Sequence, residues 1–120
     1  LKNRRPLSSI ALTTNTSTLT SISNDFNYSY IFSKQLEALG SKGDILIAIS
    51  TSGKSKNIVE ALKVSKKKKI KSVLLTGNKI TNKKYCDIVL DVPADRVDRV
   101  QELHILIGHI ICENIEKQIA

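Results

Sequence analysis

The chain alternates short apolar runs with polar connections. The runs over residues 7–13, 44–49, 72–76 and 88–92 are short enough to predict strands. The run over residues 44–49 is almost continuously apolar, reading Asp-Ile-Leu-Ile-Ala-Ile. Such a run is typical of a central parallel strand that is buried on both faces.

Between the predicted strands, apolar residues recur at helical spacing. This spacing predicts a short helical turn within residues 15–23 and a helix over residues 26–39 that ends at Gly40. It also predicts a helix over residues 56–67 and a long helix over residues 96–118. The last helix has a wide apolar stripe, so we expect it to be buried on more than one side.

This alternation predicts an α/β fold, in which an open parallel sheet carries helices on both faces. The length of 120 residues suits one domain, which we assign to residues 1–120. The chain contains no methionine and begins with a polar stretch, so we expect it to be an N-terminally incomplete part of a longer product. No apolar stretch approaches the roughly 18 residues that span a membrane.

The chain is basic, with 19 lysines and arginines against 11 acidic residues and a net charge of +8. A basic balance attracts nucleic acids and phosphorylated metabolites, although an AT-rich gene produces the same bias without a function. The lysines at residues 66–69 end a predicted helix, where the helix dipole favours cations, so we do not interpret them as a nucleic-acid site. Cys86 and Cys112 form no Cys-x-x-Cys pair, which indicates reduced thiols and a cytoplasmic protein.

Residues 50–55, here called the serine loop, follow the predicted strand over residues 44–49 and read Ser-Thr-Ser-Gly-Lys-Ser. Ligands of open α/β sheets bind beyond the carboxyl ends of the strands, and the start of the following helix attracts anions. Gly53 permits a tight turn. The loop lacks the spacing of a nucleotide-binding P-loop. Both a phosphate site and a helix start capped by hydroxyl groups are consistent with this pattern.

Two further sets of polar residues are candidates for a site. Asn24 and Asp25 precede a predicted helix, so Asp25 either caps that helix or, with Asn24, contacts sugar hydroxyls. On the last helix, Gln101 and His109 are about 80° apart around the axis and can reach one pocket. His109 lies among isoleucines and is either a core histidine or a functional one. His104 is a weaker candidate of the same kind.

Together these segments resemble the sugar isomerase (SIS) domains and, among them, the phosphoheptose isomerase family. The resemblance covers essentially the whole chain. It rests on Ser23-Asn24-Asp25-Phe26, on Ile49-Ser50-Thr51-Ser52-Gly53-Lys54-Ser55, and on Asp98-Arg99-Val100-Gln101-Glu102-Leu103-His104-Ile105 followed by His109.

The resemblance implies an isomerase that converts sedoheptulose 7-phosphate to D-glycero-D-manno-heptose 7-phosphate for bacterial surface polysaccharide, such as lipopolysaccharide or capsule. Asp98 would lie near the active site and support its helix, and His109 would be an acid/base catalyst. The residues implied in binding the phosphorylated sugar are Asn24, Asp25, Ser50, Thr51, Ser52, Ser55 and Gln101.

The resemblance also implies a zinc ion, a three-layer fold and a homotetramer with active sites between subunits. Gln101 and His109 would be two of the zinc ligands. An N-terminal helix, a first strand, the remaining zinc ligands and a catalytic glutamate would precede Leu1, so the chain alone would be inactive. Lys54 replaces the asparagine that is usual in the family, and it adds positive charge near the phosphate.

Two alternatives remain open. One is a non-catalytic SIS protein of the type that associates with a bacterial replication initiator. The resemblance implies that this type lacks a histidine at the position of His109. The other is a domain that senses a sugar phosphate, normally fused to a helix-turn-helix module, and no such module is visible in the sequence.

Overall fold

The computed structural model describes residues 4–77 and 83–119. Its parallel sheet has the order β1-β2-β3, so β2 is the central strand. The elements in chain order are α1 (Thr16–Asp25), the 3₁₀ helix η1 (Tyr28–Tyr30), α2 (Ile31–Leu39), β1 (Ile45–Ser50), α3 (Lys56–Lys68), β2 (Lys71–Gly77), the 3₁₀ helix η2 (Lys83–Tyr85), β3 (Ile88–Val92) and α4 (Val97–Ile119).

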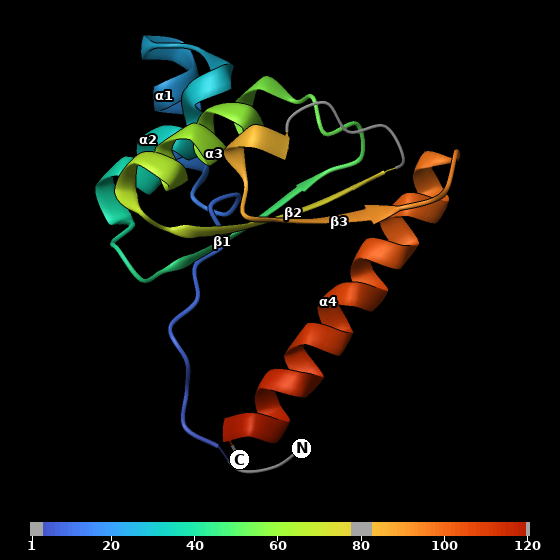
Figure 1. Cartoon of the computed structure of the whole chain (residues 1–120). Helices are drawn as coiled ribbons and strands as arrows, with labels where there is room; N and C mark the ends of the chain where they lie inside the picture. Colours follow the sequence, from blue (N-terminus) through green and yellow to red (C-terminus); the bar gives the residue numbers. More distant parts are fainter. Residues whose placement is uncertain (1–3, 78–82, 120) are drawn as a thin grey trace.

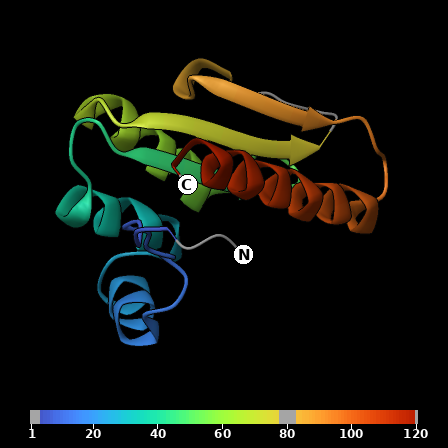
Figure 2. The same ribbon diagram turned by 90° about the horizontal axis from the view of Figure 1, so that it is seen from below.

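Helices cover both faces of the sheet. The group α1, α2 and α3 lies on one face, and α4 crosses the other face and extends beyond it (Figure 1). The view from below shows α4 running beneath the strands, with α1 and α2 set to one side (Figure 2). The expected open parallel α/β sheet with helices on both faces is therefore confirmed.

The best-buried part of the core lies between α3 and the sheet. Leu62 of α3 and Leu74 of β2 have no exposed surface, and both contact Ala48 of β1. These residues face each other because side chains alternate along a strand and α3 presents one apolar stripe to the sheet. This core fixes the height and direction of α3, whose first residue follows the serine loop.

The predicted strand over residues 7–13 is wrong. The structure has no strand there, and Leu7 and Ile10 are 43% and 65% exposed. A strand requires a neighbour to accept its backbone hydrogen bonds. None of the described strands pairs with this segment, and the Leu12 carbonyl instead accepts a hydrogen bond from Gln35 Nε2 at 2.9 Å.

Two expectations about burial are also wrong. Strand β1 lies at an edge of the described sheet, and Ile45, Ile47 and Ile49 are exposed on the face opposite α3. In α4, only Val100 and His104 are buried. The reason is geometric, because α4 packs against β2 and β3 along one narrow stripe and leaves the rest of its apolar surface uncovered. No described helix has the length and apolar character needed to cross a membrane.

We predict that Leu62→Ala costs about 2–5 kcal/mol of unfolding free energy, since it leaves a cavity in a fully buried site. Urea denaturation of the intact protein measures this loss. The matched control is Leu39→Ala on α2, where the side chain is 56% exposed and the expected change is within about 0.5 kcal/mol. Equal losses in the two variants would contradict the proposed position of the core.

A second prediction concerns Asp87, whose Oδ2 accepts hydrogen bonds from Ser72 N at 2.8 Å and Ser72 Oγ at 3.2 Å. The backbone hydrogen bond from Ser72 is the main reason why the pKa of Asp87 is lowered from its usual 3.8. A lowered folded-state pKa stabilises the protein above the unfolded-state pKa, and this contribution is lost as the pH falls through the folded-state value.

Asp87→Asn should therefore lower the Tm by a constant amount from about pH 7 to about pH 5, and by a shrinking amount below about pH 4. Thermal unfolding followed by circular dichroism across this range tests the expectation. A Tm difference that stays constant down to about pH 2 would show that the charge of Asp87 contributes nothing.

Candidate active site

The serine loop is a closed turn at the carboxyl end of β1. Ser50 is the last residue of β1, and its hydroxyl lies 3.0 Å from the hydroxyl of Ser55. The Gly53 N–H donates to the Ser50 carbonyl at 3.0 Å, and Gly53 has a φ of +63°. This left-handed conformation favours glycine. The loop thus brings the two end serines together in front of α3.

The loop delivers its hydroxyl groups to the positive end of a helix. Ser55 is the N-cap residue of α3, but its side chain makes no capping hydrogen bond and is instead next to Ser50. The first turn of α3 has no acidic residue. Helix N-termini attract anions through the helix dipole and their backbone N–H groups. The alternative of a hydroxyl-capped helix start is therefore not what the structure shows at Ser55.

The serine loop also contacts the end of β2. Because β1 and β2 are parallel, Ser50 pairs with Thr76, and both strands end at the same edge of the sheet. The Gly77 N–H donates to the Thr51 carbonyl at 3.0 Å. The Thr76 side chain is fully buried beneath Gly53, where an added methyl group would lie 3.0 Å from Thr76 Oγ1.

Two hollows adjoin the loop, and Lys54 lines both. The first, of about 260 Å³, separates the loop from the connection between β3 and α4. It is lined by Thr51, Ser52, Lys54, Gly77, Ala94, Asp95, Val97 and Val100. The second, of about 570 Å³, is lined by Asn27, Ser29, Tyr30, Lys54, Lys56, Val59, Glu60 and Lys63. The three lysines of the second hollow outnumber its one glutamate, so an anionic ligand suits this side of the loop.

The structure does not place Asn24 and Asp25 at the start of a helix, as the sequence predicted. They are the last residues of α1 rather than the start of the next helix, so Asp25 is not its cap. Both are exposed, and Asn24 Nδ2 donates to Asp25 Oδ1 at 3.1 Å. Asn27 caps the 3₁₀ helix η1, since its Oδ1 accepts from Ser29 N at 2.9 Å, whereas α2 has no side-chain cap. Neither Asn24 nor Asp25 lines the two hollows described above.

The residues proposed on α4 do not meet in a pocket of the described chain. Gln101 and His109 are exposed, and their backbone positions are about 12 Å apart along the helix. His104, the weaker candidate in the sequence, is the buried histidine, with 5% of its surface exposed. Its Nε2 lies 3.2 Å from the Thr76 carbonyl oxygen.

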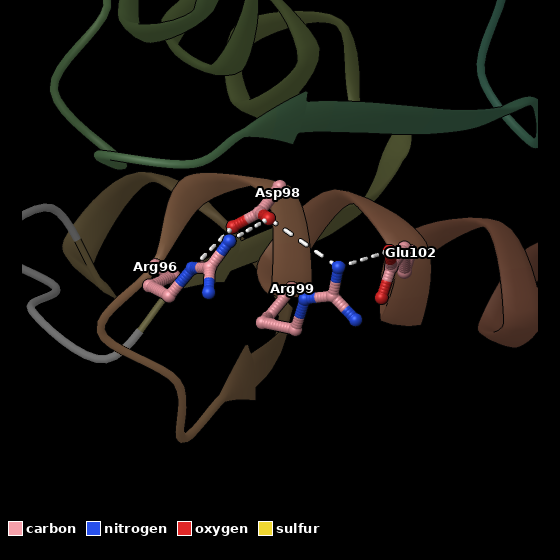
Figure 3. Close-up of polar contacts among 4 residues, drawn as sticks. All are labelled: Arg96, Asp98, Arg99 and Glu102. Atoms are coloured by element: carbon pink, nitrogen blue, oxygen red, sulfur yellow. Dashed lines mark hydrogen bonds and ion pairs between the residues drawn. The ribbon is translucent and has the colours of Figure 1, made fainter.

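Asp98 lies in the first turn of α4, next to the first hollow. Its carboxylate pairs with Arg96 at 2.6 Å and with Arg99 at 3.3 Å, and Arg99 also pairs with Glu102 at 2.8 Å (Figure 3). The hydrogen bond from Arg96 is the main reason why the pKa of Asp98 is lowered. An ionised aspartate at this terminus complements the helix dipole, which agrees with a supporting role for Asp98.

The described residues do not complete a zinc site. Within residues 4–77 and 83–119, no group of three or more His, Cys, Asp and Glu side chains is placed to hold a metal ion. Zinc in proteins usually has four ligands, of which three or four are side chains. Gln101 and His109 therefore supply at most part of such a set.

Sequence reasoning did not single out Thr76 and Gly77, which contact the serine loop, and did not show that His104 rather than His109 is buried. A signal for the first two exists, because they follow the apolar residues Val73, Leu74 and Leu75 at the carboxyl end of a predicted strand. No comparable signal marked His104, since the sequence alone does not show which of two histidines on a helix faces the sheet.

We predict that Gly53→Ala weakens phosphate binding and lowers stability by about 1–2 kcal/mol, because an L-residue is strained in the left-handed region. The added methyl group also meets the buried Thr76 side chain. Isothermal titration with inorganic phosphate and urea denaturation measure the two effects. Gly43→Ala is the matched control, because Gly43 also has a positive φ, of 99°, but an added Cβ there meets no atom within 4 Å. If both variants bind phosphate equally well, the loop conformation is not what binds the anion.

Comparison with known proteins agrees with this geometry. A family model described as the SIS domain matches residues 1–77. Phosphoheptose isomerases of Sulfurimonas denitrificans and Clostridium acetobutylicum are 53% and 51% identical to the chain over 118 residues, which are 98% of this chain and 60% of each relative. The chain thus spans about 60% of the length of these relatives.

Solved structures show the same fold. The phosphoheptose isomerase GmhA from Neisseria gonorrhoeae has a TM-score of 0.82 at 42% identity, over 88% of this chain and 61% of that one. A phosphoheptose isomerase from Francisella tularensis has a TM-score of 0.90 at 39% identity, over 95% of this chain and 62% of that one. The chain belongs to the SIS domain family, and within it is similar to the phosphoheptose isomerases.

Proposed function

We propose that this protein is a phosphoheptose isomerase, which interconverts sedoheptulose 7-phosphate and D-glycero-D-manno-heptose 7-phosphate. The observation that carries the proposal is the closed serine loop at the start of α3, in a fold shared with phosphoheptose isomerases at about 40–50% identity. The substrate phosphate is a dianion near neutral pH, and the loop combines hydroxyl donors, a helix dipole and nearby lysines.

In this proposal the serine loop binds the phosphate of the sugar. The hydroxyls of Ser50, Thr51, Ser52 and Ser55 are the donors, and Lys54 adds a cation at the junction of the two hollows. Asn24 and Asp25 contact the sugar chain. Because both are exposed at the end of α1, they would act together with groups outside the described residues.

Isomerisation moves a proton between adjacent carbons through an enediol, so it needs a base and an acid. We assign acid/base catalysis to His109 and substrate contact to Gln101. Both are exposed on α4, which leaves them accessible to a substrate. The chain spans about 60% of its relatives, and the proposal places the second catalytic group in residues beyond this span.

Zinc is part of the proposal, with Gln101 and His109 as two of its ligands. The imidazole of His109 and the amide oxygen of Gln101 are chemically suited to zinc, but they are too few to hold it. A bound zinc ion polarises a carbonyl group. Since the described residues do not complete the site, we assign no step of the reaction to the metal.

The same proposal includes a single SIS domain over residues 1–120, a cytoplasmic location, a homotetramer with active sites between subunits, and a product used for bacterial surface polysaccharide. The exposure of Gln101 and His109 supports the assembly, because groups from a second subunit would complete a site that this chain leaves open. The same exposure also favours the second candidate, a non-catalytic SIS protein that binds a partner.

Turnover of sedoheptulose 7-phosphate by the intact protein, measured with zinc and after its removal, separates the two candidates. We expect turnover with zinc, and Ser55→Ala should raise the KM by about ten- to a hundredfold, because a hydrogen bond to a charged phosphate is lost. The control is Ser41→Ala, which lies before the opposite end of β1 and should retain the wild-type KM. Absence of turnover in both metal states would favour the non-catalytic protein.

A further inference from the structure

His104 occupies an unusual position for a polar residue of α4. Its side chain is 95% buried on the sheet side of the helix, while Gln101 and His109 face solvent. The Nε2 atom lies 3.2 Å from the Thr76 carbonyl oxygen, and Nδ1 is buried without a hydrogen-bond partner among the described residues. A carbonyl oxygen only accepts, so Nε2 carries the hydrogen and donates it.

Burial of a ring nitrogen without a partner costs free energy, typically more than one hydrogen bond recovers. An apolar residue would fill the same position without this cost. Among the described residues, the hydrogen-bond partner of this ring is the Thr76 carbonyl, which belongs to the strand end next to the serine loop.

The Thr76 carbonyl and the Gly77 N–H are parts of one peptide group. Peptide groups are planar, and the structure contains no cis peptide bond among its described residues, so the two dipoles point in opposite directions from one rigid plate. On one side this plate accepts from His104 Nε2. On the other side its N–H donates to the Thr51 carbonyl at 3.0 Å. Pairing of β2 with β1 and β3 holds this peptide within the sheet, and the contact from His104 adds a further restraint at its carbonyl.

A second peptide group, in the serine loop, continues this series of hydrogen bonds. The Thr51 carbonyl shares its peptide group with the Ser52 N–H, which points away from Gly77. Hydrogen bonds in a chain polarise one another, so each bond strengthens the next donor. The series runs from His104 to the peptide of Thr76 and Gly77, and from there to the peptide of Thr51 and Ser52, in the middle of the serine loop.

Close packing at Gly77 holds the strand end against the serine loop. An added Cβ at Gly77 would lie 2.8 Å from the Thr51 carbonyl oxygen and 3.4 Å from Val100 Cγ2. Thr76 itself is fully buried beneath Gly53. A side chain at position 77 would therefore displace the Thr51 carbonyl or Val100.

We propose that His104 is a positioning residue for phosphate binding, which acts through the Thr76–Gly77 peptide to hold the Thr51–Ser52 peptide of the serine loop in its anion-binding orientation. The inference rests on the proposed function only in taking the serine loop as the phosphate site. His104 does not touch the substrate, so its loss weakens binding more than it slows the chemical step.

The test compares His104→Leu, which removes both nitrogens, with His104→Gln, which keeps an N–H donor near the Nε2 position. We expect His104→Leu to raise the Kd for inorganic phosphate, and the KM for sedoheptulose 7-phosphate, by about three- to tenfold. The kcat of His104→Leu should change by less than about twofold. In His104→Gln, the Kd for phosphate and the KM should lie within about twofold of the wild-type values.

Ser65→Ala is the matched control for a loss of stability. Ser65 is fully buried, and its Oγ donates to the Leu62 carbonyl at 2.8 Å, so this variant also loses one buried hydrogen bond to a carbonyl group. Ser65 lies about 15 Å along α3 from the serine loop. The Ser65→Ala variant should have a lower Tm than the wild type and an unchanged Kd for phosphate. In ¹⁵N–¹H spectra, the Ser52 amide signal should move in His104→Leu and stay in place in Ser65→Ala.

The outcomes separate this inference from the proposed function. If the wild type converts the sugar and His104→Leu keeps its KM and Kd, the inference is wrong and the function stands. If the wild type converts no sugar but His104→Leu still weakens phosphate binding, the inference stands and the function is wrong. A wild-type protein that binds no inorganic phosphate would overturn the inference, as would a His104→Gln variant that binds as weakly as His104→Leu.

Discussion

The parallel pairing of β1 with β2 is the constraint on which the candidate site depends. It places Ser50 opposite Thr76, so the serine loop and the end of β2 emerge at one edge of the sheet. The buried contact of Leu62 with Leu74 and Ala48 then holds α3 over these strands. Because α3 begins directly after the loop, this packing also places the N-terminus of α3 next to the hydroxyl groups.

Charge acts on the geometry that packing provides. The net charge of +8 is spread over the whole chain and does not by itself define a site. At the serine loop, however, Lys54 and Lys56 adjoin a helix start without acidic residues in its first turn. A local excess of positive charge beside backbone and hydroxyl donors is what an anionic group recognises. The arrangement at the serine loop therefore favours an anion at one place, which the overall charge of the chain does not do.

The described chain leaves much apolar surface uncovered on the α4 side. Ile45, Ile47 and Ile49 of β1 are exposed there, as are several apolar residues of α4, including Leu106 and Ile110. The chain spans about 60% of the length of the relatives it matches, and the proposed active site needs groups beyond the described residues. The serine loop, proposed to bind the phosphate, is a closed turn, whereas Gln101 and His109, proposed to act in catalysis, are exposed on α4.

The sequence by itself determined the class of fold, the position of β3 and, within a few residues, the bounds of α3, β2 and α4. These elements were predictable because apolar periodicity and turn residues act locally. It also determined the serine loop, since a glycine and clustered hydroxyls after an apolar strand are a local pattern. The roles of Asn24, Asp25, Gln101 and His109 remain predictions based on resemblance.

Only the tertiary structure decided which strand is central, which face of α4 is buried, and which histidine reaches the sheet. The segment over residues 7–13 has the composition of a strand, but none of the described strands pairs with it, and it is not a strand in the structure. His104 and His109 are chemically identical, and only the packing of α4 on β2 placed one beside the Thr76 carbonyl and left the other in solvent. Such choices depend on contacts between residues far apart in the chain, which local patterns do not encode.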